Sequence, residues 1–219
     1  MQNKWVVLLA VFAISLGVIL AIYIAPPSTN DGQSLHQQTQ YISWYPEPRK
    51  LSDFEVTQHT GEAMTNQDLQ NKWTLAFVGY TFCPDICPTT LAELNSVYPQ
   101  LTEKVQDVPL QVWFLSVDPK RDTVERLNEY VNYFNTDFIA TTATHDVLFP
   151  LVRSMGMMYS LSESTENPNY LVDHSASVVL INPQGYIVGR FKPKHIPGEL
   201  AVSDMQQVLA DMSVILGHG

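Results

Sequence analysis

The chain has 219 residues, of which 45% are hydrophobic, and its 12 lysines and arginines against 22 aspartates and glutamates give a formal net charge of −10. An acidic balance of this size argues against nucleic-acid binding and against basic docking on anionic lipid, since both need clustered positive charge. Only two cysteines are present, and no internal repeat or low-complexity tract appears.

Residues 1–25 are predicted to form an N-terminal transmembrane anchor. From Trp5 to Ala25 the sequence holds twenty-one residues without a charge, and a helix needs about 20 apolar residues to cross a bilayer. A cleaved signal peptide is the alternative, but its apolar region runs to only about 15 residues. Because Lys4 is the only charged side chain before Asp31, the positive-inside rule places the N-terminus in the cytoplasm. The chain is therefore expected to be a single-pass protein of the inner (cytoplasmic) membrane, with its globular domain in the periplasm.

The next segment, residues 26–45, is rich in proline, serine, glutamine and asparagine and shows no helical or strand periodicity. Such a composition predicts a flexible tether. Residues 46–219 have the composition of a globular protein and are long enough for one domain with a proper core.

Strand and helix patterns alternate along this domain. Continuous apolar runs at Trp73–Tyr80 and Leu110–Val117 predict strands that are buried on both faces. The other expected strands are 51–56, followed by a turn at 60–62, then 138–141, and a hairpin of 177–181 and 186–191 around Asn182–Gly185. Helices are expected at 88–101, 122–134, 145–155 and 197–216, the second with Asp122 as its N-cap and Glu125 reaching back. This order predicts an α/β fold with a central mixed sheet flanked by helices.

Both cysteines lie in the phrase GYTFCPDICP at residues 79–88, where the first long strand gives way to a helix. A disulfide that closes so small a loop removes little entropy from the unfolded chain, so a redox or metal-binding role is favoured over a structural one. With Pro88 as the first helical residue, Cys87 is expected to be the N-cap, where free amides and the helix dipole stabilise a thiolate. Cys83, on the preceding turn, is expected to fold back to meet it.

Asp118 directly follows the neighbouring buried strand. In open α/β sheets ligands gather beyond the carboxyl ends of the strands. We therefore expect the segments of Asp118 and the cysteines to come together.

Two thiolates by themselves form a redox pair, whereas a third ligand would complete a metal site. Six histidines are available: His36, His59, His145, His174, His195 and His218. His174 stands out by its context in Tyr170–Ser175, whereas His36 and His218 are expected to be solvated and His145 to lie on the surface at a helix start. Two sulfurs and one nitrogen suit low-coordinate Cu(I), while a structural zinc site would normally use four protein ligands. The methionines at 155, 157 and 158 are interpreted as core filling rather than as copper ligands.

Three phrases together resemble the Sco/SenC copper-chaperone family: GYTFCPDICP at 79–88, SVDP at 116–119 with Arg121-Asp122 beyond it, and LVDHS at 171–175. The resemblance covers residues 46–215. It implies a thioredoxin-like fold that binds one copper ion through Cys83, Cys87 and His174, with Asp118 and Asp173 in supporting roles. Phe82 stands where many members carry histidine, a departure that bears on partner docking or redox tuning rather than on metal binding.

The function implied by the resemblance is that of a metallochaperone rather than an enzyme. It would take copper from a donor protein and deliver it to the binuclear copper centre of cytochrome c oxidase subunit II. A thiol–disulfide reductase that keeps the cysteines of that subunit reduced is the main alternative, and a redox or copper sensor is another. A thiol peroxidase is disfavoured, because the proline and threonine usual ahead of a peroxidase cysteine are missing. His174 separates the first two functions, since delivery needs this side chain and disulfide exchange does not.

Overall fold

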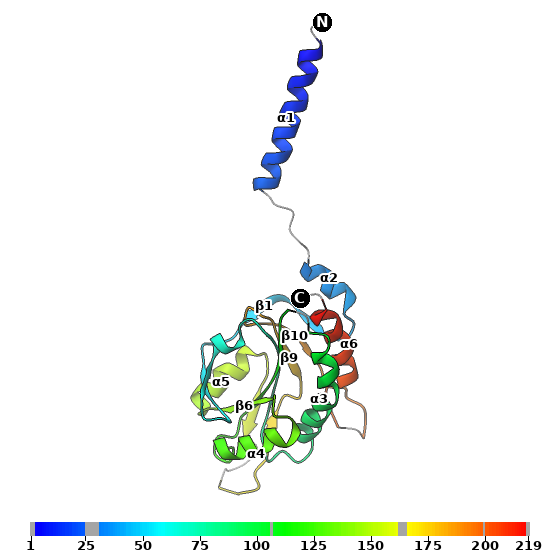
Figure 1. The fold of residues 1–219 in the computed structure, drawn as a ribbon. Coiled ribbons are helices and arrows are strands. Elements are labelled where there is room, and N and C mark those ends of the chain that lie inside the picture. The colour runs from blue at the N-terminus through cyan, green and yellow to red at the C-terminus, as the bar shows by residue number, and fades with distance from the viewer. Residues whose placement is uncertain (1–2, 25–30, 106, 162–165, 199, 218–219) are drawn as a thin grey trace. The chain divides into compact units, whose positions relative to one another are not determined.

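The computed structural model of the protein describes residues 3–24, 31–105, 107–161, 166–198 and 200–217 (Figure 1). Within the first two helices, the side chains of residues 3, 6, 10, 18–24 and 31–34 lie outside the description. The chain divides into two compact units, Met1–Gln37 and Gln38–Gly219.

The N-terminal segment forms two helices, α1 at Asn3–Ile24 and α2 at Asp31–Gln38. Within the described part of the chain, no helix combines the length and the apolar character that a membrane crossing requires. The side chains of residues 18–24, which belong to the predicted anchor, lie outside that part, and the anchor stays a prediction. Helix α2 falls within the segment predicted as an irregular tether, which was wrong for those eight residues.

The second unit is built on an eight-stranded mixed sheet with the strand order β1-β10-β9-β4-β5-β6-β2-β3. Its strands are β1 Ser43–Lys50, β2 Glu55–Gln58, β3 Ala63–Thr65, β4 Trp73–Gly79, β5 Leu110–Ser116, β6 Ile139–Thr142, β9 Val178–Ile181 and β10 Tyr186–Phe191. Strands β4, β5 and β6 run parallel, and the other neighbours are antiparallel. Two short strands, β7 Tyr159–Leu161 and β8 Val172–His174, pair in a separate small sheet.

The helices of this unit are α3 Ile86–Thr102, α4 Val124–Phe134, α5 His145–Ser154 and α6 Met205–Leu216, with a short 3₁₀ turn at Asn66–Leu69. Helices α3 and α6 pack together on one side of the sheet, and α5 lies on the other side (Figure 1). Every residue of β5 and all but the first of β4 are buried, as the continuous apolar runs predict. The α/β architecture with a mixed central sheet is confirmed and is thioredoxin-like.

Several predicted boundaries differ from the observed ones. The last helix begins at Met205 and not at 197, because Asp204 is its N-cap and accepts hydrogen bonds from the backbone N–H groups of Gln206 and Gln207 at 2.9 and 3.2 Å. Helix α4 is capped by Thr123 rather than Asp122, and the Thr123 hydroxyl accepts from the Arg126 N–H at 3.2 Å. The first strand predicted for the domain, 51–56, is displaced to β2.

The central sheet begins at β1, before the predicted domain start at residue 46, and a buried carboxylate holds the chain just ahead of this strand. Asp211 on α6 accepts hydrogen bonds from three successive backbone N–H groups, those of Gln40, Tyr41 and Ile42, at 2.9, 2.7 and 2.6 Å. Only 3% of Asp211 is exposed. A buried charge is tolerated where hydrogen bonds replace its lost hydration, and these three bonds do so.

Replacing Asp211 with alanine is expected to destabilise the domain by about 3 kcal/mol, because three backbone donors lose a charged acceptor. Denaturant unfolding of the parent and variant chains, followed by tryptophan fluorescence, measures the difference. Asp53→Ala is the control, because Asp53 is exposed and pairs with Lys50 on the surface at 3.5 Å. An Asp211→Ala chain as stable as the Asp53→Ala chain would contradict the prediction.

Candidate metal centre

The site begins where β4 ends, at Gly79. A Cβ atom at this position would overlap the Sγ of Cys87 and lie 2.8 Å from the ring of Phe114. Glycine is therefore required here by close approach: the strand end, the thiol and the aromatic ring occupy the space that a side chain would need.

The helix that carries Cys87 starts earlier than the sequence predicts. Its N-cap is Asp85, whose carbonyl accepts the first intrahelical bond from the Thr89 N–H at 3.2 Å. Cys87 thus lies inside the first turn and is not the N-cap. The prediction failed because Pro88 at the third helical position costs nothing: N–H groups of the first turn have no intrahelical partner.

Cys83 lies on the turn before the helix and folds back as expected. Its N–H donates to the carbonyl of Tyr80 at 3.2 Å, and its Sγ accepts a long hydrogen bond from the Cys87 N–H at 3.5 Å. Cys83 is half-buried, whereas only 1% of Cys87 is exposed. Both cysteines are free thiols.

The negative charge of the pair is carried by Cys83, not by Cys87 as predicted. The pKa of the Cys83 thiol is lowered to about 3, chiefly by a hydrogen bond from the Cys87 thiol, with smaller contributions from His174 and from nearby backbone N–H groups that outweigh partial burial. Burial raises the pKa of the Cys87 thiol, and the neighbouring Cys83 adds to that rise. The expected effect of the helix N-terminus at Cys87 is overcome because the thiol lies too deep.

His174 ends β8 and completes the group. Its Nε2 lies 3.4 Å from the Sγ of Cys87, its Nδ1 lies 3.3 Å from the carbonyl oxygen of Ser175, and its ring meets Tyr80 edge-on. A proton on Nδ1, donated to that carbonyl, would leave Nε2 free to bind a metal held by the two thiols. Asp173, for which the sequence predicts a supporting role, is exposed and lines the two pockets beside His174, and that role stays a prediction.

The two Sγ atoms and one imidazole nitrogen of Cys83, Cys87 and His174 all lie within 4.8 Å of one another. Within the described residues, no other three histidine, cysteine or acidic side chains converge in this way. Two soft sulfurs and a nitrogen are donors that copper accepts, so the three side chains fit a copper ion and form a candidate copper site.

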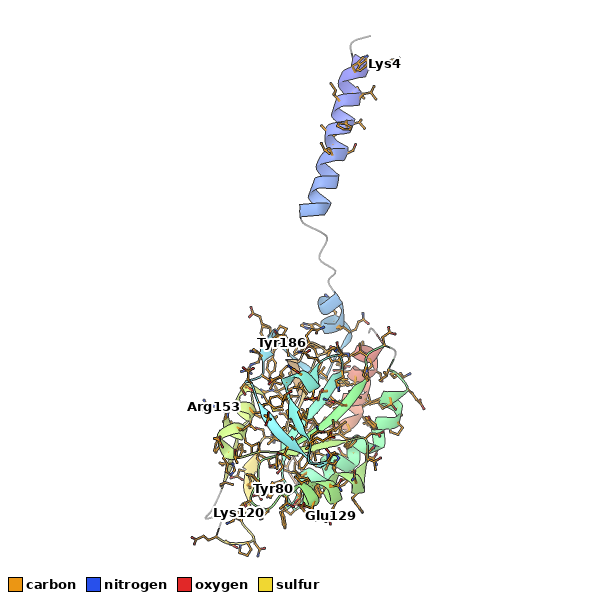
Figure 2. All side chains as sticks on the ribbon, turned by 60° about the vertical axis from the view of Figure 1, so that its left-hand side comes forward. Lys4, Tyr80, Lys120, Glu129, Arg153 and Tyr186 are labelled. Atoms are coloured by element: carbon orange, nitrogen blue, oxygen red, sulfur yellow. The ribbon has the colours of Figure 1, made fainter. Side chains whose placement is uncertain are left out.

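Asp118 lies close to this site but acts through other side chains. It is buried and accepts hydrogen bonds from Arg121 Nε at 2.5 Å and from the Tyr170 hydroxyl. The Arg121 guanidinium in turn lies 5.5, 4.8 and 3.6 Å from the ring centroids of Tyr80, Phe82 and Tyr170. Asp118 therefore fixes a cation against the aromatic residues that lead into the cysteine loop. Tyr80 and Lys120 mark this end of the domain in Figure 2.

Arg121 belongs to the motif that follows β5, but neither its role nor that of Tyr170 was predicted from the sequence. A signal was present in the sequence, because Asp118 and Arg121 lie three residues apart and carry opposite charges that can pair. Phe82 is half-exposed and is flanked by a second guanidinium, that of Arg126, at 5.3 Å from its ring centroid.

The remaining candidate ligands lie elsewhere. His59 is a buried histidine whose Nδ1 accepts from the Ala140 N–H at 3.2 Å, and His145 is partly buried with its Nδ1 2.8 Å from the Tyr159 hydroxyl. His36 and His195 are exposed, and His218 lies outside the described residues. The interpretation of the methionines as core filling is confirmed for Met155 and Met157 and wrong for Met158, which is 74% exposed.

Comparison with known proteins places these features in a family. The SCO1/SenC family matches residues 45–210. A protein of Stutzerimonas stutzeri that is named as copper-binding is 31% identical over 193 residues, which cover 88% of this chain and 91% of that protein. The human mitochondrial SCO1 homologue is 33% identical over 150 residues, 68% of this chain and 50% of that protein. The chain thus spans about half the length of this mitochondrial relative.

The fold and the donor set agree with that match. The copper-bound crystal structure of ScoI from Arabidopsis thaliana has a TM-score of 0.61 and 30% sequence identity, and the match covers 74% of this chain and 97% of that one. From the matched length and from these similarities, we conclude that the chain belongs to the SCO1/SenC family.

Proposed function

We propose that Cys83, Cys87 and His174 bind one copper ion and that the protein carries this ion as cargo. The observation that supports the proposal most directly is the convergence of two free thiols and one imidazole within 4.8 Å. The copper-bound state of a structural neighbour supports the same choice of metal. The recipient that we propose is the binuclear copper centre of cytochrome c oxidase subunit II, loaded after transfer from a donor protein.

Each of the three side chains has a distinct part in the proposed transfer. Cys83 is ready as a thiolate, whereas Cys87 has a raised pKa and must release a proton to bind the metal. Cys83 and His174 are partly exposed, so the thiols or imidazoles of a partner can approach the cargo from their side. Cys87 is closed off from solvent and is the ligand least accessible to exchange.

A second candidate function, thiol–disulfide reduction, is favoured by the same asymmetry. A half-buried thiol with a strongly lowered pKa next to a buried thiol with a raised pKa is typical of an attacking and a resolving cysteine. The reductase would act on the cysteines of the same oxidase subunit. His174 separates the two functions, because copper binding requires this side chain and disulfide exchange does not.

We also propose that residues 1–25 anchor the protein in the inner membrane, with the domain in the periplasm. The support is the uncharged run from Trp5 to Ala25. After an alkaline carbonate wash, the full chain is expected to remain in the membrane fraction, and a chain that begins at Gln38 is expected in the soluble fraction. Release of the full chain by the wash would contradict the anchor.

Anaerobic titration of the reduced protein with Cu(I), in competition with a chromophoric chelator, tests the copper site. The parent is expected to bind one equivalent tightly, and Cys83→Ser, Cys87→Ser and His174→Ala are each expected to lose tight binding, because each removes one of three ligands. His195→Ala is the matched control, since His195 is exposed and lies outside the group. Full affinity in the His174→Ala variant would overturn the three-ligand site and favour the reductase.

Gly79→Ala is expected to lower the copper affinity by about tenfold or more without changing any ligand, because the added methyl group forces the Cys87 thiol or the Phe114 ring to move. The same competition titration measures the loss, and the unfolding midpoint shows whether the chain remains folded. Gly217→Ala at the end of α6 is the control, since its Cβ would meet only carbonyl oxygens of its own helix, at 3.2 and 3.8 Å. Parent affinity in a folded Gly79→Ala chain would show that the thiol tolerates displacement.

A further inference from the structure

Asp122 is a buried carboxylate whose place in the structure is not explained by helix capping. It is fully buried just ahead of α4, and Thr123 rather than Asp122 caps that helix. Burying an ionised side chain in such a place costs roughly several kcal/mol of folding free energy unless hydrogen bonds replace its hydration. The groups that provide those bonds therefore indicate what the carboxylate holds.

Three hydrogen bonds reach the two oxygens of Asp122. The backbone N–H of Thr81 donates at 2.9 Å, the hydroxyl of Thr81 at 2.7 Å, and the hydroxyl of Ser116 at 2.5 Å. Arg126 Nε adds a fourth contact by donating to the Thr81 hydroxyl at 3.1 Å. Main chain and side chain of Thr81 are thus both tied to the start of α4, and through Ser116 to the end of β5.

Thr81 lies two residues before Cys83, in the irregular segment between β4 and α3. That segment also contains the turn in which the Cys83 N–H donates to the Tyr80 carbonyl. A loop without sheet or helix bonds has few means of holding a thiol in one position. The two hydrogen bonds that Thr81 donates to Asp122 provide a rigid support within this turn, at the residue after Tyr80.

We propose that Asp122 is a positioning residue for the metal centre: by binding Thr81 it holds the Cys83 thiol within reach of Cys87 and His174. The inference rests on the proposed copper site, but the residue touches none of the three ligands. The charge of Asp122 also raises the pKa of the Cys87 thiol, so the Thr81 variants, which leave this charge in place, isolate the positioning effect. Outer residues of this kind typically change metal affinity by about 10- to 100-fold when they are replaced.

The test uses the reduced full chain with three variants, Asp122→Asn, Thr81→Val and Thr81→Ser. Asp122→Asn replaces an acceptor oxygen by an NH₂ donor. Thr81→Val removes the bonded hydroxyl while keeping the shape of the side chain, and Thr81→Ser keeps the hydroxyl and removes only the methyl group. We expect the first two to weaken Cu(I) binding by about tenfold or more and, in a separate titration with a Cu(II) salt, to shift the thiolate-to-Cu(II) charge-transfer band. Thr81→Ser is expected to keep the parent values. If Asp122→Asn does not fold, the Val and Ser pair still decides the question.

Asp211→Asn is the matched control, because Asp211 is also buried and accepts three hydrogen bonds, but from backbone groups at the start of the domain. It should lower the unfolding midpoint while leaving the copper affinity and the absorption band at the parent values. Equal losses of affinity in the Asp122→Asn and Asp211→Asn chains at equal loss of stability would overturn the proposal. So would parent affinity in both Asp122→Asn and Thr81→Val.

A metal-free measurement separates this inference from the proposed function. The equilibrium constant for the Cys83–Cys87 disulfide against a glutathione buffer reports how well the two thiols are held together. We expect it to fall several-fold in Asp122→Asn and Thr81→Val and to stay at the parent value in Asp211→Asn. A parent chain that binds no copper but shows this pattern would refute the copper site and support the positioning role. An unchanged constant in both variants would refute the positioning role.

Discussion

The parallel pairing of β4 with β5 is the constraint on which the site depends. Seven residue pairs run without a slip from Trp73 opposite Leu110 to Gly79 opposite Ser116, and the Val117 N–H continues the ladder by donating to the Gly79 carbonyl at 2.9 Å. Both strands therefore end at one level, and the two loops that follow them are neighbours. One loop carries the cysteines and the other carries the acidic residues that support them. A shift by one residue would reverse the side chains of a whole strand.

Much of the fold could be predicted from the sequence, because its central strands are buried on both faces. Continuous apolar runs identify β4 and β5, and the turn residues Asn182–Gly185 identify the hairpin of β9 and β10. The three candidate ligands could also be found, since the chain has two cysteines and the histidine phrase matches the family resemblance. The structure brings those three side chains together.

The remainder depends on tertiary contacts that no local pattern contains. Strands β7 and β8 have three residues each, too few to show a period of two, yet they place His174. Asp122 is a residue type that is common at helix N-caps, so the sequence predicts a cap. Only the parallel pairing of β4 with β5 brings Thr81 close enough to bond to it. The difference in pKa between the Cys83 and Cys87 thiols likewise follows from how deeply each thiol is buried, which cannot be read from the sequence.

The clamp of Asp211 on Gln40–Ile42 also determines how mechanical tension enters the domain. A pull on the chain from its N-terminal side meets this clamp before it meets β1, which is an edge strand of the sheet. The load therefore passes into helix α6, which packs on α3, the helix that carries Cys87. Edge strands peel from a sheet one hydrogen bond at a time, whereas three bonds that converge on one carboxylate must be broken together. The three hydrogen bonds to Asp211 thus protect the edge strand β1 from force transmitted along the chain.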